Sequence, residues 1–300
     1  MLVADVRAGL TGSPKVLAPK YFYDARGSEL FDQITSVEDY YPTRCERALL
    51  NRHAPEITAG FEELVELGSG MADKTHALLF AMAGTGELRR YVPFDVDPSV
   101  VERCAADLEE KYPGLEVHGV VGDFERELSL IPPDEKRLFA FLGGTLGNLD
   151  PGMRTRFLAA LREVVGPTDA LLVGIDLEKD PATLERAYDD SEGVTAEFNR
   201  NVLVVLNREL DADFDPAAFE HVAVWVEEDK RVEMRLRASS KQHVRLPGAD
   251  IEVDFDEGEE MRTEISCKFT REGIEEELRT AGFTPRAFFT DGLFALALAA

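Results

Sequence analysis

The chain has few cysteines and histidines for its 300 residues. The cysteines, Cys45, Cys104 and Cys267, are odd in number and lie far apart, which is not the pattern of a disulfide framework. The histidines have no metal-ligand spacing with the cysteines or with one another; they are His53, His76, His118, His221 and His243. We therefore expect no bound metal and a reducing compartment.

Long apolar runs are also lacking. No apolar stretch is long enough to cross a bilayer, and the chain does not open on a signal peptide. These absences predict a cytoplasmic protein with no membrane partner.

Basic residues are in deficit, with 33 Lys and Arg against 58 Asp and Glu and a formal net charge of -25. So acidic a surface repels polyphosphate, which argues against a nucleic-acid partner. By itself the charge indicates solubility, or adaptation to a salty or acidic-proteome host. Hydrophobic residues make up 44% of the chain, enough to bury the core of one large domain or two smaller ones.

Strand-like and helical segments alternate from about residue 43 to residue 177. The helical segments are 43–59, 72–84, 98–112 and 152–165, and the strand-like segments are 64–67, 91–97, 115–124, 137–144 and 169–177. This alternation predicts a parallel sheet with helices on both faces.

The pattern changes after residue 177. A polar helical stretch, 181–210, precedes four strand-like runs that predict an antiparallel meander: 219–227, 231–239, 250–255 and 262–269. A helix at 270–283 and strand-like segments at 284–290 and 293–299 close the chain. We expect the aromatic N-terminal segment to pack on this insertion.

These segments predict an α/β fold, a Rossmann-like core interrupted by a β-rich α+β domain. The core comprises residues 45–177 and 269–300, and the second domain comprises 1–44 and 178–268.

A glycine turn follows the first core strand in LVELGSGMADKT (64–75). Open parallel sheets bind ligands at such strand ends. The turn lacks the third glycine of the dinucleotide motif, because Asp73 stands there, and it lacks the Gly-Lys-Ser/Thr ending of a P-loop. A helix start can still receive a carboxylate, and Lys74 adds positive charge, although a purely structural turn remains an alternative.

Two more acids follow the next two strands. Asp95 can accept hydrogen bonds from both hydroxyls of a ribose, and Asp123 with Phe124 can bind an adenine amino group and cover the ring. Together with the turn they favour S-adenosylmethionine (SAM) over NAD, whose pyrophosphate needs the missing glycine. Each acid alone could instead be a helix cap. The closing helix and two strands also resemble the reversed hairpin that ends SAM-dependent methyltransferases.

Nearly the whole chain, from about Asp5 to the C-terminus, resembles the histidine Nα-methyltransferases of ergothioneine biosynthesis. The resemblance rests on KYFYDARGSELFDQITSVEDYYPTR, LVELGSGMADKT, PFDVD, GDFE, FLGGTLGNL, AYDDSEGVTAEFNRNVL and EEMRTEISCKF. It implies a SAM-dependent methyltransferase that trimethylates the α-amino group of L-histidine to hercynine. We expect a monomer with no metal; the alternative is a related N-methyltransferase for another amino acid or a histidine derivative.

The resemblance also implies which residues form the site. SAM would be contacted by Tyr23, Gly68, Lys74, Asp95, Asp123, Phe124 and Gly143. Histidine would be contacted by Tyr40, Asn148, Tyr188, Met234, Glu264 and Ser266, of which Tyr40 and Asn148 are the catalytic candidates.

Glu264 and Ser266 are two apart on a predicted strand, so they project to one side and can together read the N–H groups of an imidazole. Thr263, Ile265, Cys267 and Phe269 are then expected to face the other way. Asn148 and Tyr188 can donate hydrogen bonds to the substrate carboxylate. The alternative for Glu264 and Ser266 is the solvated face of an antiparallel strand.

Two other functional hypotheses remain, a different enzyme class and a protein without catalytic activity. A nicotinamide-dependent oxidoreductase is disfavoured by the incomplete glycine motif. A binding module that keeps the fold without catalysis is disfavoured because both the donor-site acids and the amino-acid pocket are present.

Overall fold

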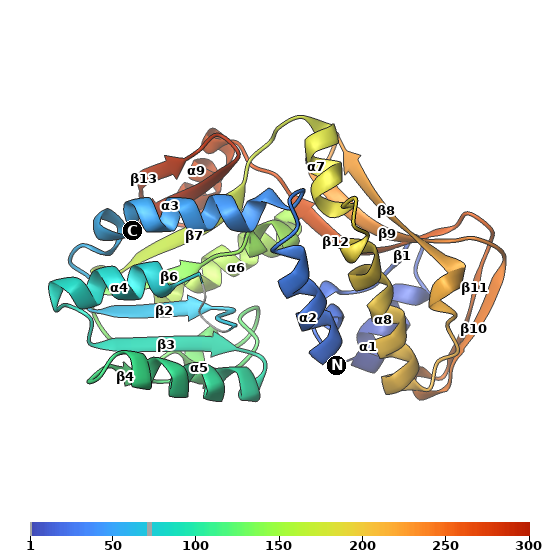
Figure 1. The fold of residues 1–300 in the computed structure, drawn as a ribbon, viewed down its shortest axis with the longest axis horizontal. Coiled ribbons are helices and arrows are strands. Elements are labelled where there is room, and N and C mark those ends of the chain that lie inside the picture. Colours follow the sequence, from blue (N-terminus) through green and yellow to red (C-terminus); the bar gives the residue numbers. More distant parts are fainter. Residues whose placement is uncertain (1, 71–73) are drawn as a thin grey trace. The chain divides into compact units, whose positions relative to one another are not determined.

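The computed structural model describes residues 2–70 and 74–300 (Figure 1). The predicted helix start at residue 72 and the position of Asp73 lie outside the described residues. The chain divides into two compact units. The insertion unit comprises Met1–Tyr41 and Lys179–Cys267, and the core unit comprises Pro42–Glu178 and Lys268–Ala300.

The core unit is built on one sheet in the order β13-β14-β7-β6-β2-β3-β4, with β5 also paired to β3. Its strands are β2 (Glu63–Leu67), β3 (Arg90–Asp95), β4 (Glu116–Val117), β5 (Val120–Val121), β6 (Arg137–Phe141), β7 (Ala170–Asp176), β13 (Pro285–Thr290) and β14 (Phe294–Ala299). Strands β2 to β7 pair in parallel, whereas β14 runs antiparallel to both β7 and β13. The order reverses between β2 and β6, so the predicted Rossmann-like fold with a reversed C-terminal hairpin is confirmed.

The central strands are apolar runs because both of their faces are covered. Every residue of β2, β6, β7 and β14 is buried. The helices of this unit are α3 (Tyr41–Thr58), α4 (His76–Thr85), α5 (Pro98–Lys111), α6 (Pro151–Val164) and α9 (Arg271–Thr280). Side chains cap three of them, since Asp97, Asp150 and Thr270 accept hydrogen bonds from backbone N–H groups in the first turns of α5, α6 and α9.

The third predicted core strand, 115–124, is wrong in its length. The structure has only β4 and β5, two residues each, separated by His118 and Gly119. Here the edge of the sheet packs closely on α5. A Cβ on Gly119 would lie only 2.3 Å from Cγ1 of Val101, which leaves no room for a side chain. The short 3₁₀ segments η2 (Leu128–Leu130) and η3 (Thr145–Asn148) follow β5 and β6.

The insertion unit combines helices with a four-stranded sheet in the order β1-β12-β9-β8. The strands of this sheet are β1 (Lys15–Val16), β8 (Phe219–Val226), β9 (Arg231–Ala238) and β12 (Glu260–Cys267), and a separate two-stranded sheet consists of β10 (Gln242–Leu246) and β11 (Ile251–Phe255). Its helices are α1 (Leu2–Leu10), α2 (Ala25–Ile34), α7 (Pro181–Tyr188) and α8 (Val194–Leu210), with 3₁₀ turns η1 (Pro19–Phe22), η4 (Pro216–Ala218) and η5 (Pro247–Ala249). Helices α2 and α8 lie side by side (Figure 1).

Two predictions for this unit are corrected. The helical stretch 181–210 is two helices, because Asp190 accepts the N–H groups of Glu192, Val194 and Thr195 and so starts α8 anew. The run 250–255 is not part of the meander: as β11 it pairs only with β10, which the sequence analysis did not assign. The place beside β12 is taken by β1, which pairs with it in parallel.

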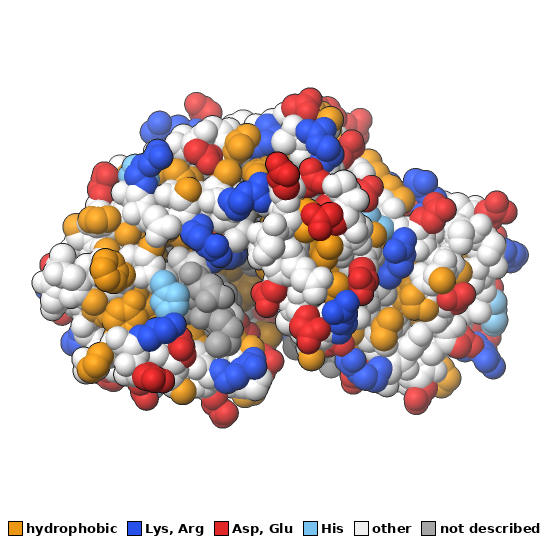
Figure 2. All heavy atoms as spheres, in the orientation of Figure 1, with side chains coloured by type: hydrophobic (Ala, Val, Ile, Leu, Met, Phe, Trp, Pro, Cys, Tyr) orange, Lys and Arg blue, Asp and Glu red, His pale blue; other side chains and the backbone are white. Residues whose placement is uncertain are grey.

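The acidic residues are spread over the surface of both units rather than gathered in one patch, on the face that Figure 2 shows. Many of them are paired, as in Arg26–Glu197 and Arg208–Asp24 on α2 and α8. None of the helices in the described part of the chain has the length and apolar character needed to cross a bilayer.

Candidate functional site

The glycine turn at the end of β2 is held against the end of β3. Gly68 and Gly70 have φ of +70° and +50°, which a residue with a Cβ rarely adopts. The Gly68 N–H donates to the Phe94 carbonyl at 2.8 Å, and the Gly70 N–H donates to Oδ2 of Asp95 at 3.1 Å. The turn and Asp95 therefore form one structure at the carboxyl edge of the sheet.

Asp95 is not the cap of the following helix. That cap is Asp97, which accepts from the N–H of Ser99 at 2.8 Å. Asp95 instead accepts from the N–H of Asp97 at 3.1 Å through Oδ1. The alternative that its carboxylate serves only as a helix cap is therefore excluded.

Asp123 and Phe124 lie at the same edge, because Val121 in β5 pairs with Asp95 in β3. Oδ1 of Asp123 accepts from the N–H of Glu125 at 2.9 Å, so this carboxylate also shapes its own turn. Phe124 is half-buried and packs edge-on against Phe141 and Phe157, at ring-centre distances of 5.2 and 5.7 Å. Its ring is thus a fixed apolar wall next to the acid.

Lys74 and Gly143 are joined through Glu46, a residue that the sequence analysis missed. Oε1 of Glu46 accepts from the N–H of Gly143 at 2.7 Å, and Oε2 lies 3.5 Å from Nζ of Lys74. The side chain of Glu46 is only 1% exposed, whereas that of Lys74 is 25% exposed. A sequence signal existed: Glu46 is followed at i+3 and i+4 by the buried Leu49 and Leu50, which puts an acid on the apolar face of α3.

A second buried acid lies directly beneath the glycine turn. Glu66 in β2 accepts hydrogen bonds from the hydroxyls of Thr75 and Tyr91, the latter at 2.5 Å. Burial raises the pKa of Glu66 to about 7, and these two hydrogen bonds offset only part of that effect. The site therefore contains a carboxyl group that titrates near neutral pH.

Asn148 belongs to the same unit and the same edge. It ends η3, the turn that follows β6 and Gly143, and it is half-buried. We call Gly68, Lys74, Asp95, Asp123, Phe124, Gly143 and Asn148 the donor cluster, after the SAM contacts that the resemblance implies for the first six; Asn148 is predicted to contact histidine. All seven are in the core unit.

The other predicted site residues are all in the insertion unit. We call Tyr23, Tyr40, Tyr188, Met234, Glu264 and Ser266 the imidazole cluster, after the histidine contacts that the resemblance implies for the last five. The Tyr188 hydroxyl and the Ser266 hydroxyl are 2.7 Å apart and share a hydrogen bond. The rings of Tyr40 and Tyr188 meet edge-on at 6.1 Å, and both residues are buried.

Tyr23 lies with these residues, although the sequence analysis gave it a SAM contact. Its ring meets Phe31 and Phe198 edge-on at 5.6 Å each. Tyr23 keeps 48% of its surface exposed, yet its surroundings desolvate the phenol and the nearby charge of Glu264 acts in the same direction. Both effects raise the pKa of Tyr23 well above its usual range, so its hydroxyl keeps its proton.

A β-bulge in β12 decides which way Glu264 and Ser266 point. Arg262 pairs with Arg235, but Glu264 pairs with Met234, so Thr263 is an extra residue in the strand. Glu264 and Ser266 consequently share the face of Met234 and Val232, which are 2% and 1% exposed. A regular strand would have put them opposite Glu233 and Arg231, on the face where charged side chains pair with one another.

The same bulge corrects the predicted alternation. Thr263 does not face away from Glu264, since its hydroxyl donates to Oδ1 of Asn199 in α8. Ile265 and Cys267 do lie on the other face, opposite Glu233 and Arg231. Phe269 lies beyond the end of β12, in the core unit, where it bridges to Leu177.

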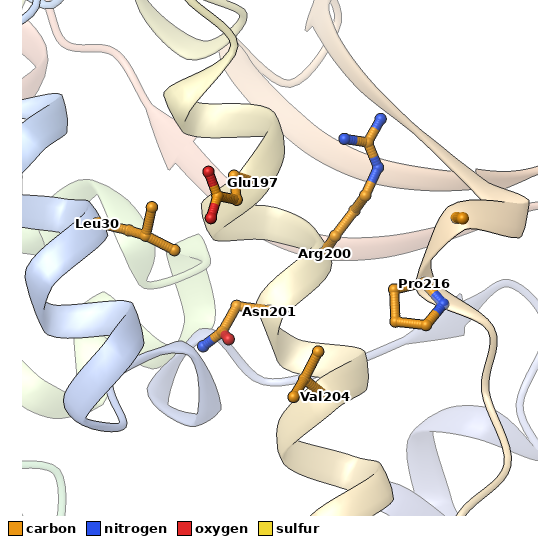
Figure 3. A pocket seen from close by; sticks show the side chains of 7 residues that line it. Leu30, Glu197, Arg200, Asn201, Val204 and Pro216 are labelled. Atoms are coloured by element: carbon orange, nitrogen blue, oxygen red, sulfur yellow. The ribbon is translucent and has the colours of Figure 1, made fainter.

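A groove in the insertion unit is lined by residues of neither cluster. About 530 Å³ lies between α2, α8 and η4 (Figure 3), and the lining residues are Leu30, Glu197, Arg200, Asn201, Val204, Pro216 and Ala217. A second hollow of about 440 Å³ is lined by Asp32, Gln33, Ser36, Val37, Glu192 and Val194. Within residues 2–70 and 74–300, no group of three His, Cys, Asp or Glu side chains is arranged to hold a metal ion.

The chain matches known proteins over nearly its full length. The family described as "Histidine-specific methyltransferase, SAM-dependent" matches residues 2–300. A "Histidine N-alpha-methyltransferase" of Mycolicibacterium smegmatis is 54% identical over 299 residues, which cover 98% of this chain and 93% of that protein. Another, from Mycobacterium tuberculosis, is 53% identical over 300 residues, which cover 99% of this chain and 94% of that protein.

A fungal protein matches part of the chain. "Ergothioneine biosynthesis protein 1" of Neurospora crassa is 32% identical over 197 residues, which cover 63% of this chain and 22% of that protein. The match of the family over residues 2–300 covers both the core unit and the insertion unit. The chain belongs to the family of SAM-dependent, histidine-specific methyltransferases.

Proposed function

We propose that this enzyme is an L-histidine Nα-methyltransferase, which transfers three methyl groups from SAM to the α-amino group of L-histidine and forms hercynine. The observation that carries the proposal is the bulge at Thr263. It turns Glu264 and Ser266 to the buried face, where the Ser266 hydroxyl is hydrogen-bonded to the hydroxyl of Tyr188. Two bacterial relatives at 53–54% identity are named for this activity. The fungal relative's name supports a place in ergothioneine biosynthesis, as its first step.

The donor cluster suits an adenosine with an amino-acid tail. Asp95 would accept hydrogen bonds from the ribose hydroxyls, and Asp123 with Phe124 would bind the adenine edge and ring. Lys74 would pair with the donor's carboxylate, beside the backbone of Gly68 and Gly143. Because the turn lacks the third glycine of the dinucleotide motif, an adenosine with a carboxylate-bearing tail fits it better than a pyrophosphate does. Tyr23 is a further proposed SAM contact.

The imidazole cluster suits a charged amino acid with a ring that carries N–H groups. Glu264 and Ser266 would accept hydrogen bonds from the imidazole, with Met234 beside them on the same face of the sheet. Tyr188 and Asn148 would donate hydrogen bonds to the carboxylate. An apolar side chain would leave the Glu264 carboxylate without a partner, which disfavours such substrates.

The chemical step is an in-line displacement. The lone pair of the neutral α-amine attacks the methyl carbon of the sulfonium, a C–N bond forms, the C–S bond breaks, and S-adenosylhomocysteine leaves. After the first and second transfers, the methylated ammonium must lose a proton before its nitrogen can attack again. Tyr40 and Asn148 would position the amine, and positioning supplies most of the acceleration because no charged nucleophile has to be generated on the enzyme.

Mass spectrometry of products formed from SAM and a panel of amino acids tests the proposal. We expect trimethylated histidine as the main product. Methylation of a different amino acid, or of a histidine derivative but not histidine, would replace this function with that of a related N-methyltransferase. A protein that binds SAM and methylates none of the panel would be a binding module.

We further propose that the enzyme works in the cytoplasm as a monomer. None of Cys45, Cys104 and Cys267 forms a disulfide within residues 2–70 and 74–300, which supports a reducing compartment. Sedimentation of the purified protein with and without SAM tests the monomer.

A further inference from the structure

A chain of buried hydrogen bonds runs from the bulge in β12 to the end of α7. The Thr263 hydroxyl donates to Oδ1 of Asn199 at 2.7 Å. Nδ2 of Asn199 lies 2.8 Å from Nδ1 of His221, and Nε2 of His221 lies 2.7 Å from the carbonyl oxygen of Tyr188. Asn199, Thr263 and the side chain of His221 are each no more than 1% exposed.

The direction of every hydrogen bond in this chain is fixed. An amide nitrogen can only donate, so Nδ1 of His221 must accept and the ring proton must be on Nε2. That proton is then donated to the Tyr188 carbonyl, one of the acceptors that a helix leaves open at its C-terminal end. Burial lowers the pKa of His221, and the charges of Asp189 and Asp190 only partly oppose this, so the ring stays neutral at physiological pH.

Asn199 also ties together the two strands that meet at the bulge. The second proton of its amide group goes to the carbonyl oxygen of Arg235 at 3.1 Å, and the Thr263 hydroxyl lies 3.0 Å from the carbonyl oxygen of Met234. Arg235 and Met234 are the β9 partners of the residues on either side of Thr263. Both amide protons and the carbonyl oxygen of the Asn199 side chain are therefore engaged, and two of these three hydrogen bonds are made at the bulge in β12.

We propose that Thr263, Asn199 and His221 are positioning residues for recognition of the substrate's side chain. They hold the bulge that turns Glu264 and Ser266 toward the buried face, and they hold the backbone of Tyr188 so that its hydroxyl reaches Ser266. The inference rests on the proposed function for the identity of the substrate. None of the three is a catalytic residue, because each acts through Tyr188, Glu264 or Ser266.

The sharpest test is Thr263→Val, which removes the hydroxyl and keeps the branched shape. We expect the KM for histidine to rise about tenfold, the cost of one buried hydrogen bond within a network. The preference for histidine over phenylalanine, measured as the ratio of kcat/KM values, should fall by a similar factor. Binding of S-adenosylhomocysteine, measured by calorimetry, should change less than about twofold. Thr263→Ser keeps the hydroxyl and should behave like the wild type.

A matched pair of variants on α8 separates positioning from general damage. Asn199→Ala removes the amide at the bulge, whereas Asn207→Ala removes an amide of the same helix that bonds only the backbone of Phe214. Both changes cost stability, but only Asn199→Ala should raise the KM for histidine. Hydrogen exchange of the amides of residues 263–266 should become about tenfold faster in Thr263→Val and Asn199→Ala than in Asn207→Ala.

The outcomes distinguish this inference from the proposed function. A wild-type enzyme that does not methylate histidine refutes the proposed function, and the exchange rates at the bulge then decide the positioning role alone. An active wild type with unchanged histidine KM in Thr263→Val overturns the positioning role. Equal losses of histidine and S-adenosylhomocysteine binding would also overturn it, since they would mean that the network serves only overall stability.

Discussion

Glu66 offers a quantitative test of how the core unit holds a carboxyl group beneath the glycine turn. Its pKa is raised from the usual 4.5 to about 7, first because the side chain is buried, while hydrogen bonds from Thr75 and Tyr91 act in the opposite sense. Between these two pH values the folded protein binds the proton more tightly than the unfolded chain does. The free energy of unfolding must therefore fall as the pH rises through this window.

Replacement by glutamine isolates the effect. In Glu66→Gln the group no longer titrates, so the stability difference between variant and wild type should shift in the variant's favour by on the order of 2–3 kcal/mol between pH 5 and pH 8. Glu63, whose pKa burial likewise raises to about 7, is present in both proteins and cancels in the difference. Urea denaturation of both proteins at the two pH values, followed by circular dichroism, measures the shift.

A third protein sharpens the result. Tyr91→Phe removes a hydroxyl that donates to the Glu66 carboxylate, so the pKa of Glu66 should rise further and the total fall in stability between pH 5 and pH 8 should become larger. A difference between Glu66→Gln and wild type that does not depend on pH would refute the reasoning. It would mean that water reaches the carboxylate, or that the side chain leaves its buried place.

Three further predictions concern the two clusters. Asp95→Ala should weaken S-adenosylhomocysteine binding at least about tenfold in calorimetry and leave the KM for histidine nearly unchanged, because this carboxylate would bind the ribose; equal losses would contradict the assignment. Glu264→Ala should do the reverse, raising the KM for histidine by about tenfold or more with donor binding intact. Glu46→Gln keeps an acceptor for the N–H of Gly143 but removes the charge that pairs with Lys74 and holds its ammonium in place for the donor's carboxylate. Affinity should therefore fall for S-adenosylhomocysteine and not for methylthioadenosine, which has no carboxylate. Similar losses for both ligands would show that Glu46 supports only the fold.

Most strands and helices of the core unit follow from local patterns in the sequence. Strands β2, β6 and β7 and the helices between them were predicted within a few residues, because a strand buried on both faces is mostly apolar. The buried Glu66 in β2 is an exception, and its carboxylate is hydrogen-bonded. The strand predicted at 115–124 was too long, since contact with α5 rather than composition limits the length of β4 and β5. In the insertion unit, the local hairpin of β10 and β11 was missed because β10 was not assigned. The parallel pairing of β1 with β12 joins residues 15–16 to residues 261–262, which no local pattern reveals.

The residue types of the proposed site were readable, but two of its supporting groups were not. Asp95 was singled out by its place after a strand, and the structure ties it to Gly70. Glu46 and Asn199 were missed because each is a polar residue in an otherwise ordinary helix, and only the tertiary contacts show what each one holds.

The sequence by itself determined the alternation of strands and helices, the glycines with positive φ at the end of β2, and the acids that follow β3 and β5, because these depend on periodicity and on what a single residue's backbone can adopt. Only the tertiary structure decided the face on which Glu264 and Ser266 lie. Their spacing of two is the same on either face. The extra residue Thr263, hydrogen-bonded to Asn199 of α8, shifts the register by one and turns both side chains to the buried side.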